Sequence, residues 1–262
     1  MGVLIKIDGV TFNEKYIIDN VEIPEPVVPV TIADYPVTDT LIGLYDLGGT
    51  AEASLANRSA EIGGIDGTDH AKTPAIEGGT VSEDWVSFTG QFNQNRMLTY
   101  VPTTLTSEMI TLVALFSVPA GQTQSNRVII GNRGGSTVPE QMGISLWNDG
   151  VRFGSNGSLT TKSFAGINSN NFAILALTMD ESHIRVVRYS NSGLTTLLEY
   201  EGHIEPWVNR YFVIGGDSTS TGGGTAYISL AAIHEGDMSE DRLKDICEFV
   251  KTYGKQKGLT IE

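Results

Sequence analysis

The feature that most restricts the fold of this chain is the recurrence of short apolar runs between clusters of Gly, Asn, Ser and Thr. The 262 residues include 30 glycines, and the runs begin at residue 41. Some runs alternate apolar and polar residues while others are continuously apolar, as two sheets packed face to face require. This spacing predicts an all-β, two-sheet antiparallel sandwich. The runs are LIGLYDL (41–47), WVSFTG (85–90), MITLVALFSV (109–118), RVIIG (127–131), MGISLW (142–147), GVRFGS (150–155), FAILALTM (172–179), HIRVVRY (183–189), LTTLLEY (194–200), YFVIGG (211–216) and AYISLAAIH (226–234).

One α-helix is predicted near the C-terminus, over residues 239–256. Asp237 and Glu240 have the spacing of a capping box, with Asp in place of Ser or Thr. Gly258 can end the helix. The apolar residues fall on one helical face, which we expect to pack on the sandwich or on a neighbouring subunit. They are Leu243, Ile246, Cys247 and Val250, and Cys247 is expected to be a buried small hydrophobe.

The first 35 residues have a different character from the rest. Apolar and polar residues alternate around Asp8-Gly9, which predicts a β-hairpin. Pro24, Pro26 and Pro29 then predict a stiff, extended linker, because proline cannot donate to a sheet ladder. We therefore expect an N-terminal β-arm and linker over residues 1–35 and a sandwich over residues 36–262.

Composition excludes several classes of protein. The single cysteine cannot form an intrachain disulfide, which disfavours a disulfide-stapled secreted module. The formal net charge of -14 disfavours nucleic acid and anionic membranes as partners. The N-terminus lacks the apolar core of a signal peptide, and no apolar run approaches the length of a membrane-spanning helix.

Retaining glycosidases need a close pair of carboxylates, usually at alternate positions of one strand. The apolar runs carry almost none, and Asp180-Glu181 and Glu83-Asp84 are adjacent residues at expected turns. The glycine-rich stretch 215–224 lacks the Gly-Lys-Ser/Thr of a phosphate loop, so we interpret it as a flexible connection. The sequence therefore predicts a protein that is not an enzyme and needs no cofactor.

Metal-binding patterns are weak. Asp66, Asp69 and His70 in GIDGTDH could contribute to a calcium site, although a Gly-Asp turn explains the same residues. Histidines 70, 183, 203 and 234 lack zinc-type spacing. No metal site is predicted, and calcium near Asp66 and Asp69 is left open.

Two tryptophans lie beside hydrogen-bonding side chains near expected turns. An aromatic ring next to Asn, Asp or Arg can stack on a sugar ring while the polar groups bind its hydroxyls. Trp85, by contrast, starts an apolar run and is expected in the core. The predicted carbohydrate-binding residues are Trp147, Asn148, Asp149, Trp207, Asn209 and Arg210.

The order of the segments carries a family resemblance. LIGLYDLG (41–48) is followed by Asn57-Arg58-Ser59, then by FTG (88–90) and MITLVALFSV. NFAILALT (171–178), FVIGG (212–216), AYISLAAIH and MSEDRL (238–243) come later. This order resembles the concanavalin A-like, laminin G-like domains of phage and bacterial surface proteins. The family includes lectins, lyases, hydrolases and adhesion modules. Gly48 departs from its usual acidic residue, and the Glu-x-Asp-x-x-Glu strand of its laminarinase-like members is missing.

These observations predict a bacteriophage virion protein of the fibre, tail or capsid-decoration kind, assembled in the bacterial cytoplasm. Residues 1–35 would attach it to other virion proteins, and a homo-oligomer would display the lectin-like sandwich to neutral host glycans. A stand-alone carbohydrate-binding lectin is the alternative, and a polysaccharide-degrading hydrolase or lyase is a third hypothesis. Neither nucleic-acid binding nor membrane insertion is expected.

Overall fold

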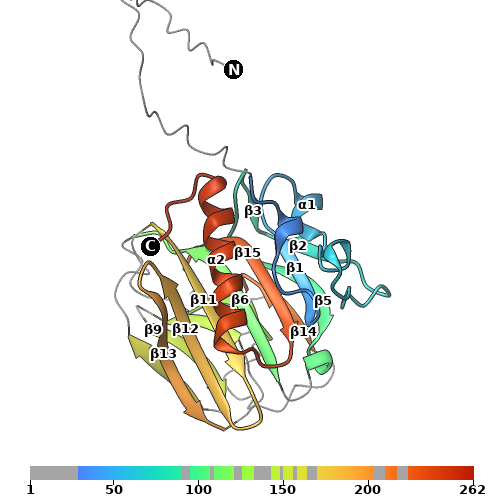
Figure 1. The fold of residues 1–262 in the computed structure, drawn as a ribbon. Coiled ribbons are helices and arrows are strands. Elements are labelled where there is room, and N and C mark those ends of the chain that lie inside the picture. The colour runs from blue at the N-terminus through green and yellow to red at the C-terminus, as the bar shows by residue number, and fades with distance from the viewer. Residues whose placement is uncertain are drawn as a thin grey trace, which may run out of the picture.

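The computed structural model describes residues 29–89, 95–106, 109–120, 126–132, 143–147, 150–155, 158–163, 170–202, 210–216 and 224–262. Over these residues the chain forms two antiparallel β-sheets with one long helix near the C-terminus (Figure 1). The predicted two-sheet sandwich and its C-terminal helix are confirmed. The predicted hairpin at Asp8-Gly9 lies outside the described residues.

The first sheet, sheet A, follows the strand order β13-β12-β11-β6-β15-β4-β3, and β1 also pairs with β15. Its central strands β6 and β11 are buried at every position, which explains their continuously apolar sequences. Its strands are β1 Leu41–Asp46, β3 Thr80–Val81, β4 Val86–Phe88, β6 Ile110–Ser117, β11 Phe172–Met179, β12 His183–Ser190, β13 Gly193–Glu201 and β15 Ala226–Glu235.

The second sheet, sheet B, follows the order β10-β9-β8-β7-β14-β5-β2. Buried and half-buried residues alternate along β5 and β14, so one face of each strand meets sheet A and the other points away. Its strands are β2 Ala75–Glu77, β5 Arg96–Pro102, β7 Asn126–Gly131, β8 Gly143–Trp147, β9 Gly150–Ser155, β10 Ser158–Ser163 and β14 Tyr211–Ile214.

Short helical segments lie in the connections, and sequence reasoning missed them because each is only a turn or so long. They are η1 Ile32–Asp34, α1 Ala51–Leu55, η2 Ala60–Ile62 and η3 Thr103–Thr106. In the part of the chain that the structure describes, no helix has the length and apolar character needed to cross a bilayer.

The main core lies between the sheets. Phe88, Phe116 and Phe212 are fully buried there, together with the inward residues of β5, β6, β11 and β15. Burial of this apolar surface is the main force holding the two sheets together.

Helix α2 (Glu240–Gln256) lies along the outer face of sheet A and closes a second apolar cluster (Figure 1). Its predicted stripe is confirmed, since Leu243, Ile246, Cys247 and Val250 are at most 4% exposed. Burial raises the pKa of the Cys247 thiol to about 12, so it is an unreactive core residue.

The two ends of α2 differ in how well the sequence predicted them. The predicted Asp237 cap is wrong, because Ser239 occupies the N-cap and its hydroxyl accepts from the Arg242 amide. At the other end, Gly258 adopts φ +81°, the left-handed conformation in which glycine ends helices, as predicted.

The segment before β1 packs on the outer face of sheet A. Tyr35 and Val37 are buried in the cluster that α2 covers, and Val30 and Ile32 pack against it. The boundary expected at residue 36 therefore falls inside a segment that contacts the sandwich.

Candidate functional site

The outward faces of β5 and β14 carry the aromatic surface that most resembles a binding site. Phe212 and Ile214 point into the main core, so Tyr211 and Val213, which alternate with them, point away from sheet A. Tyr211 is half-buried and lies against Tyr100 of β5. A ligand could therefore reach this surface without opening the core.

Tyr100 lies at a β-bulge and, like Leu98 and Pro102, on the outward face of β5. Val213 pairs with Leu98 and Tyr211 with Pro102, so the register between β5 and β14 shifts around Tyr100. Tyr100 has φ +53°, a left-handed conformation that bulky residues rarely adopt. The hydroxyl of Thr99 donates to the Phe212 carbonyl at 2.6 Å and stabilises the bulge. Bulges often re-aim a side chain next to a functional site.

The two tyrosine rings meet edge to face. Their centroids are 5.1 Å apart, and their planes are inclined at 77°. This is a favourable aromatic geometry, and it sets two ring faces almost at right angles.

Asp69 completes this arrangement, and we call Tyr100, Tyr211 and Asp69 the tyrosine site. The Asp69 amide donates to the Tyr100 carbonyl at 2.9 Å, and the Tyr211 hydroxyl donates to Asp69 Oδ2 at 2.9 Å. The hydrogen bond from Tyr211 lowers the pKa of Asp69, and the same bond raises the pKa of Tyr211. Asp69 is therefore an ionised acceptor beside the two rings.

Asn57 holds the loop that carries Asp69. Its side-chain amide donates to the Ile42 carbonyl at 3.0 Å and to Asp66 Oδ1 at 2.9 Å. Its Oδ1 accepts from the Leu44 amide at 2.9 Å. The Asn57-Arg58-Ser59 turn thus ties residues 66–69 to β1, and its role is to position the loop.

The metal hypothesis for this loop finds no support in its geometry. Asp66 Oδ1 also accepts from the Thr68 amide, and Asp69 Oδ1 accepts from the Ala71 amide, as in Asx turns. His70 Nε2 is 3.4 Å from Asp66 Oδ2. No group of three or more His, Cys, Asp or Glu side chains is placed to hold a metal among the described residues.

Most of the residues predicted from sequence to bind carbohydrate cannot be placed. Asn148, Asp149, Trp207 and Asn209 lie outside the described residues. Trp147 is the last residue of β8, and its backbone pairs with Asn126 and Gly150. Its side chain is not among those that the structure describes.

Arg210 is the predicted residue that the structure does place. It is exposed and immediately precedes Tyr211. Its carbonyl accepts hydrogen bonds from the amide and the hydroxyl of Thr103. The structure thus brings Arg210 next to the tyrosine site.

Sequence reasoning missed Tyr100, Tyr211 and Asp69 as one group. A search for tyrosines as well as tryptophans beside polar residues would have found Tyr211, which follows Arg210. Tyr100 gives no such signal, because its contact with Tyr211 depends on pairing between strands more than a hundred residues apart.

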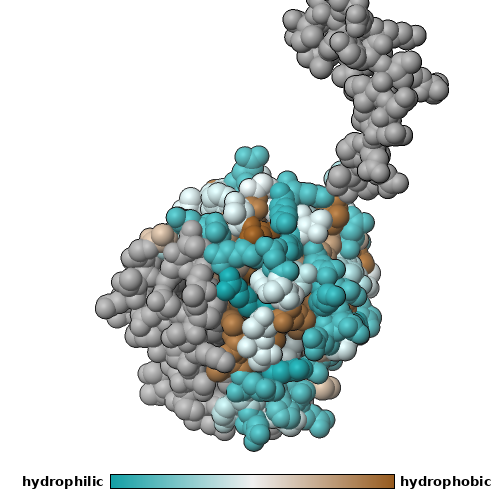
Figure 2. Space-filling model, turned by 60° about the vertical axis from the view of Figure 1, so that its left-hand side comes forward, coloured by the Kyte–Doolittle hydropathy of each residue, from teal (hydrophilic) through white to brown (hydrophobic). Residues whose placement is uncertain are grey.

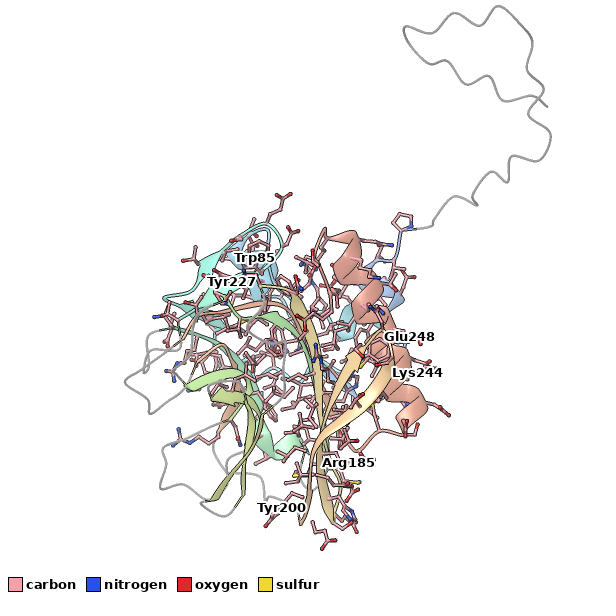
Figure 3. The ribbon with its side chains drawn as sticks, turned by 90° about the vertical axis from the view of Figure 1, so that its left-hand side faces the viewer. Trp85, Arg185, Tyr200, Tyr227, Lys244 and Glu248 are labelled. Carbon is pink, nitrogen blue, oxygen red and sulfur yellow. The ribbon has the colours of Figure 1, made fainter. Side chains whose placement is uncertain are left out.

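Trp85, Tyr227 and Phe172 form a second aromatic group. Trp85 and Tyr227 lie together at one end of the sandwich (Figure 3). Trp85 is half-buried, and its ring centroid is 5.7 Å from that of Tyr227 and 6.0 Å from that of Phe172. On the face drawn in Figure 2, hydrophobic patches of the sandwich reach the surface between hydrophilic residues. Because Trp85 and Tyr227 pack against the cluster under α2, we assign them to packing, close to the expected core role of Trp85.

The fold and the tyrosine site together define a two-sheet antiparallel β-sandwich with an aromatic surface site. No protein-family model and no curated protein matches the chain. Solved structures share the fold. The binding domain of botulinum neurotoxin serotype D is 10% identical with a TM-score of 0.57, covering 81% of this chain and 52% of that one.

Two further structures agree on the sandwich. The binding domain of Paraclostridial Mosquitocidal Protein 1 is 11% identical with a TM-score of 0.54, covering 80% of this chain and 52% of that one. A sialidase of Trypanosoma rangeli is 12% identical with a TM-score of 0.52, covering 84% of this chain and 34% of the enzyme. This chain thus spans about half of each binding domain and about a third of the sialidase. The similarity shows a shared fold.

Proposed function

We propose that this chain is a carbohydrate-binding sandwich whose ligand contacts Tyr100, Tyr211 and Asp69. The observation that carries the proposal is the bulge that holds Tyr100 at φ +53° against Tyr211 and beside Asp69. Packing alone would not require a bulky residue in this conformation on the outward face of a sheet.

The chemistry of the tyrosine site suits a sugar. A pyranose ring has a flat apolar face that stacks on an aromatic ring, and its hydroxyls donate to a carboxylate. Asp69 is ionised and carries lone pairs beyond the two hydrogen bonds it accepts from Tyr211 and Ala71. Fixing Asp69 before the ligand arrives reduces the ordering cost of binding.

The same geometry favours binding over catalysis. A glycosidase needs a carboxylic acid whose pKa is raised so that it can protonate the leaving group. The pKa of Asp69 is lowered instead. Glu77, a second carboxylate on neighbouring β2, accepts a hydrogen bond from Arg96 Nε at 2.8 Å, and this contact favours its charged form rather than a proton donor. The structures of two toxin binding domains share the fold over four fifths of this chain, which agrees with a binding role.

We propose further that the chain is a concanavalin A-like phage virion component with the sandwich displayed outward. The acidic composition, the single cysteine and the order of the segments support this proposal. Residues 1–35 would attach the chain to other virion proteins, and display in many copies would strengthen weak glycan binding. A stand-alone lectin would bind glycan equally well but would be missing from purified particles.

A glycan array probed with an oligomeric form of the full chain tests the binding proposal. We expect binding to neutral or zwitterionic glycans, and Tyr211→Ala should weaken it at least about tenfold. Tyr211→Phe keeps the ring and is the matched control for stacking. Trp147→Ala and Trp207→Ala measure the contribution of the two tryptophans predicted from sequence. If no glycan binds, the proposal is wrong; release of reducing sugar would favour an enzyme instead.

A further inference from the structure

We infer that the tyrosine site prefers a sugar that carries a protonated amine over the same sugar with that amine acetylated and therefore neutral. This inference rests on the proposed carbohydrate-binding function and narrows its ligand class. It comes from the angle between the two rings and from the charge of the carboxylate beside them.

The angle between the rings suits a compact cation. Planes inclined at 77° with centroids 5.1 Å apart do not form a flat platform, so a flat pyranose can stack on only one of them. An ammonium group is small and tetrahedral, and it can approach both ring faces at once. Each aromatic face attracts a cation through its quadrupole, as in the aromatic sites that bind ammonium ligands.

The carboxylate supplies the charge that a cation needs. The Tyr211 hydroxyl donates to Asp69 Oδ2, and the Ala71 amide donates to Oδ1. These bonds fix Asp69 in its ionised form beside the rings, where it can form a charge-assisted hydrogen bond with an ammonium group. The net charge of -14 also raises the local concentration of cationic ligands.

Positively charged side chains also lie near the tyrosine site, and they would repel an ammonium ligand. Lys72 and His70 are close enough to stabilise the charge of Asp69, and Arg210 precedes Tyr211. Lys72 and His70 are solvent-exposed, so water and salt screen their effect on an ammonium group in direct contact with Asp69. An anionic substituent on a zwitterionic sugar could contact these cations.

The test compares two oligosaccharides with the same backbone. Tetramers of β-1,4-linked glucosamine and of N-acetylglucosamine are titrated against the full chain at about pH 6, where the free amine is protonated. We expect the glucosamine tetramer to bind about tenfold more tightly. Asp69→Asn keeps an oxygen acceptor for Tyr211 and should reduce the preference to about twofold. Glu181→Gln removes one negative charge from the exposed turn between β11 and β12, and it should leave the preference unchanged.

A second measurement needs no variant. Tetramethylammonium chloride should displace the glucosamine tetramer more strongly than sodium chloride of equal ionic strength, because tetramethylammonium also fits the two ring faces. Equal affinity for the two tetramers, or equal displacement by the two salts, would overturn the amine preference. Binding of the neutral tetramer that Tyr211→Ala abolishes would still support the proposed function. If neither tetramer binds, the amine preference is wrong, and the glycan array decides the proposed function separately.

Discussion

The hydroxyl of Tyr35 lies 2.8 Å from Nε2 of His234, where the N-terminal segment meets sheet A. Both residues are buried, and the other ring nitrogen of His234 lies 3.2 Å from the Thr40 hydroxyl. Burial, together with the nearby charge of Arg242, lowers the pKa of His234 to about 3. The ring is therefore neutral in the folded protein and is held by two hydroxyl groups.

This buried histidine makes stability depend on pH in a defined window. The unfolded chain binds a proton at His234 near pH 6.5, whereas the folded chain does so only near pH 3. The contribution of His234 to stability is therefore complete above about pH 6.5 and is lost progressively as the pH falls toward 3. Urea unfolding at a series of pH values should show a falling free energy of unfolding across this window.

His234→Gln is the matched variant, because glutamine can accept and donate hydrogen bonds but does not titrate. It should be less stable than the parent at neutral pH, and its free energy of unfolding should fall less steeply below pH 6.5. Identical pH slopes for the two proteins would contradict the assignment.

Helix α2 should depend on its apolar stripe. Leu243→Asp places a charge in a contact where the leucine is only 4% exposed, so it should reduce the free energy of unfolding by about 3–5 kcal/mol. Lys244→Asp puts the same side chain at the next, exposed position, where it should cost less than about 1 kcal/mol. Thermal unfolding of the two variants measures the difference, and equal melting temperatures would show that the stripe is not buried.

Removing either of two buried hydroxyl groups on strand β6 should change the free energy of unfolding differently. Ser117 Oγ is buried without a hydrogen-bond partner among the described residues. Ser117→Ala should therefore leave the free energy of unfolding unchanged or raise it by up to about 1 kcal/mol. Thr111 is equally buried but donates to the Gly236 carbonyl at 3.1 Å, so Thr111→Val should cost about 1 kcal/mol. A loss of stability in Ser117→Ala would mean that its hydroxyl has a partner.

Tyr100 should separate stability from binding. Asparagine tolerates the left-handed conformation better than tyrosine, and this gain offsets the loss of the edge-to-face contact with Tyr211, so Tyr100→Asn should leave the melting temperature nearly unchanged. The same change removes one of the two ring faces and should weaken glycan binding. A clear loss of stability would show that Tyr100 serves packing rather than ligand contact.

Truncation should distinguish the arm from the segment that packs on the sandwich. If residues 1–35 attach the chain to a virion, as proposed above, deleting residues 1–28 should leave a folded protein that is missing from purified particles. Deleting residues 1–37 also removes Tyr35 and Val37 from the cluster under α2, so it should lower the melting temperature as well. Circular dichroism measures folding, and analysis of purified particles measures incorporation; normal incorporation of the shorter truncation would contradict the attachment role.

The fold was predictable because its determinants are local. The continuous apolar runs of β6 and β11 and the stripe of α2 appear directly in the sequence. The tyrosine site was not predictable, because it depends on pairing between distant parts of the chain. Tyr100 and Tyr211 become neighbours through the pairing of β5 with β14, and Asp69 joins them through a loop that Asn57 holds.

The packing of Tyr35 on sheet A makes the two sides of the sandwich different from each other. The N-terminal segment meets the sandwich on the outer face of sheet A, whereas the tyrosine site lies on the outer face of sheet B. The N-terminal segment and the tyrosine site therefore lie on opposite sides of the sandwich. If copies are held through this segment, as proposed above, the packing of Tyr35 would place each tyrosine site across the sandwich from the point where the chain enters the fold.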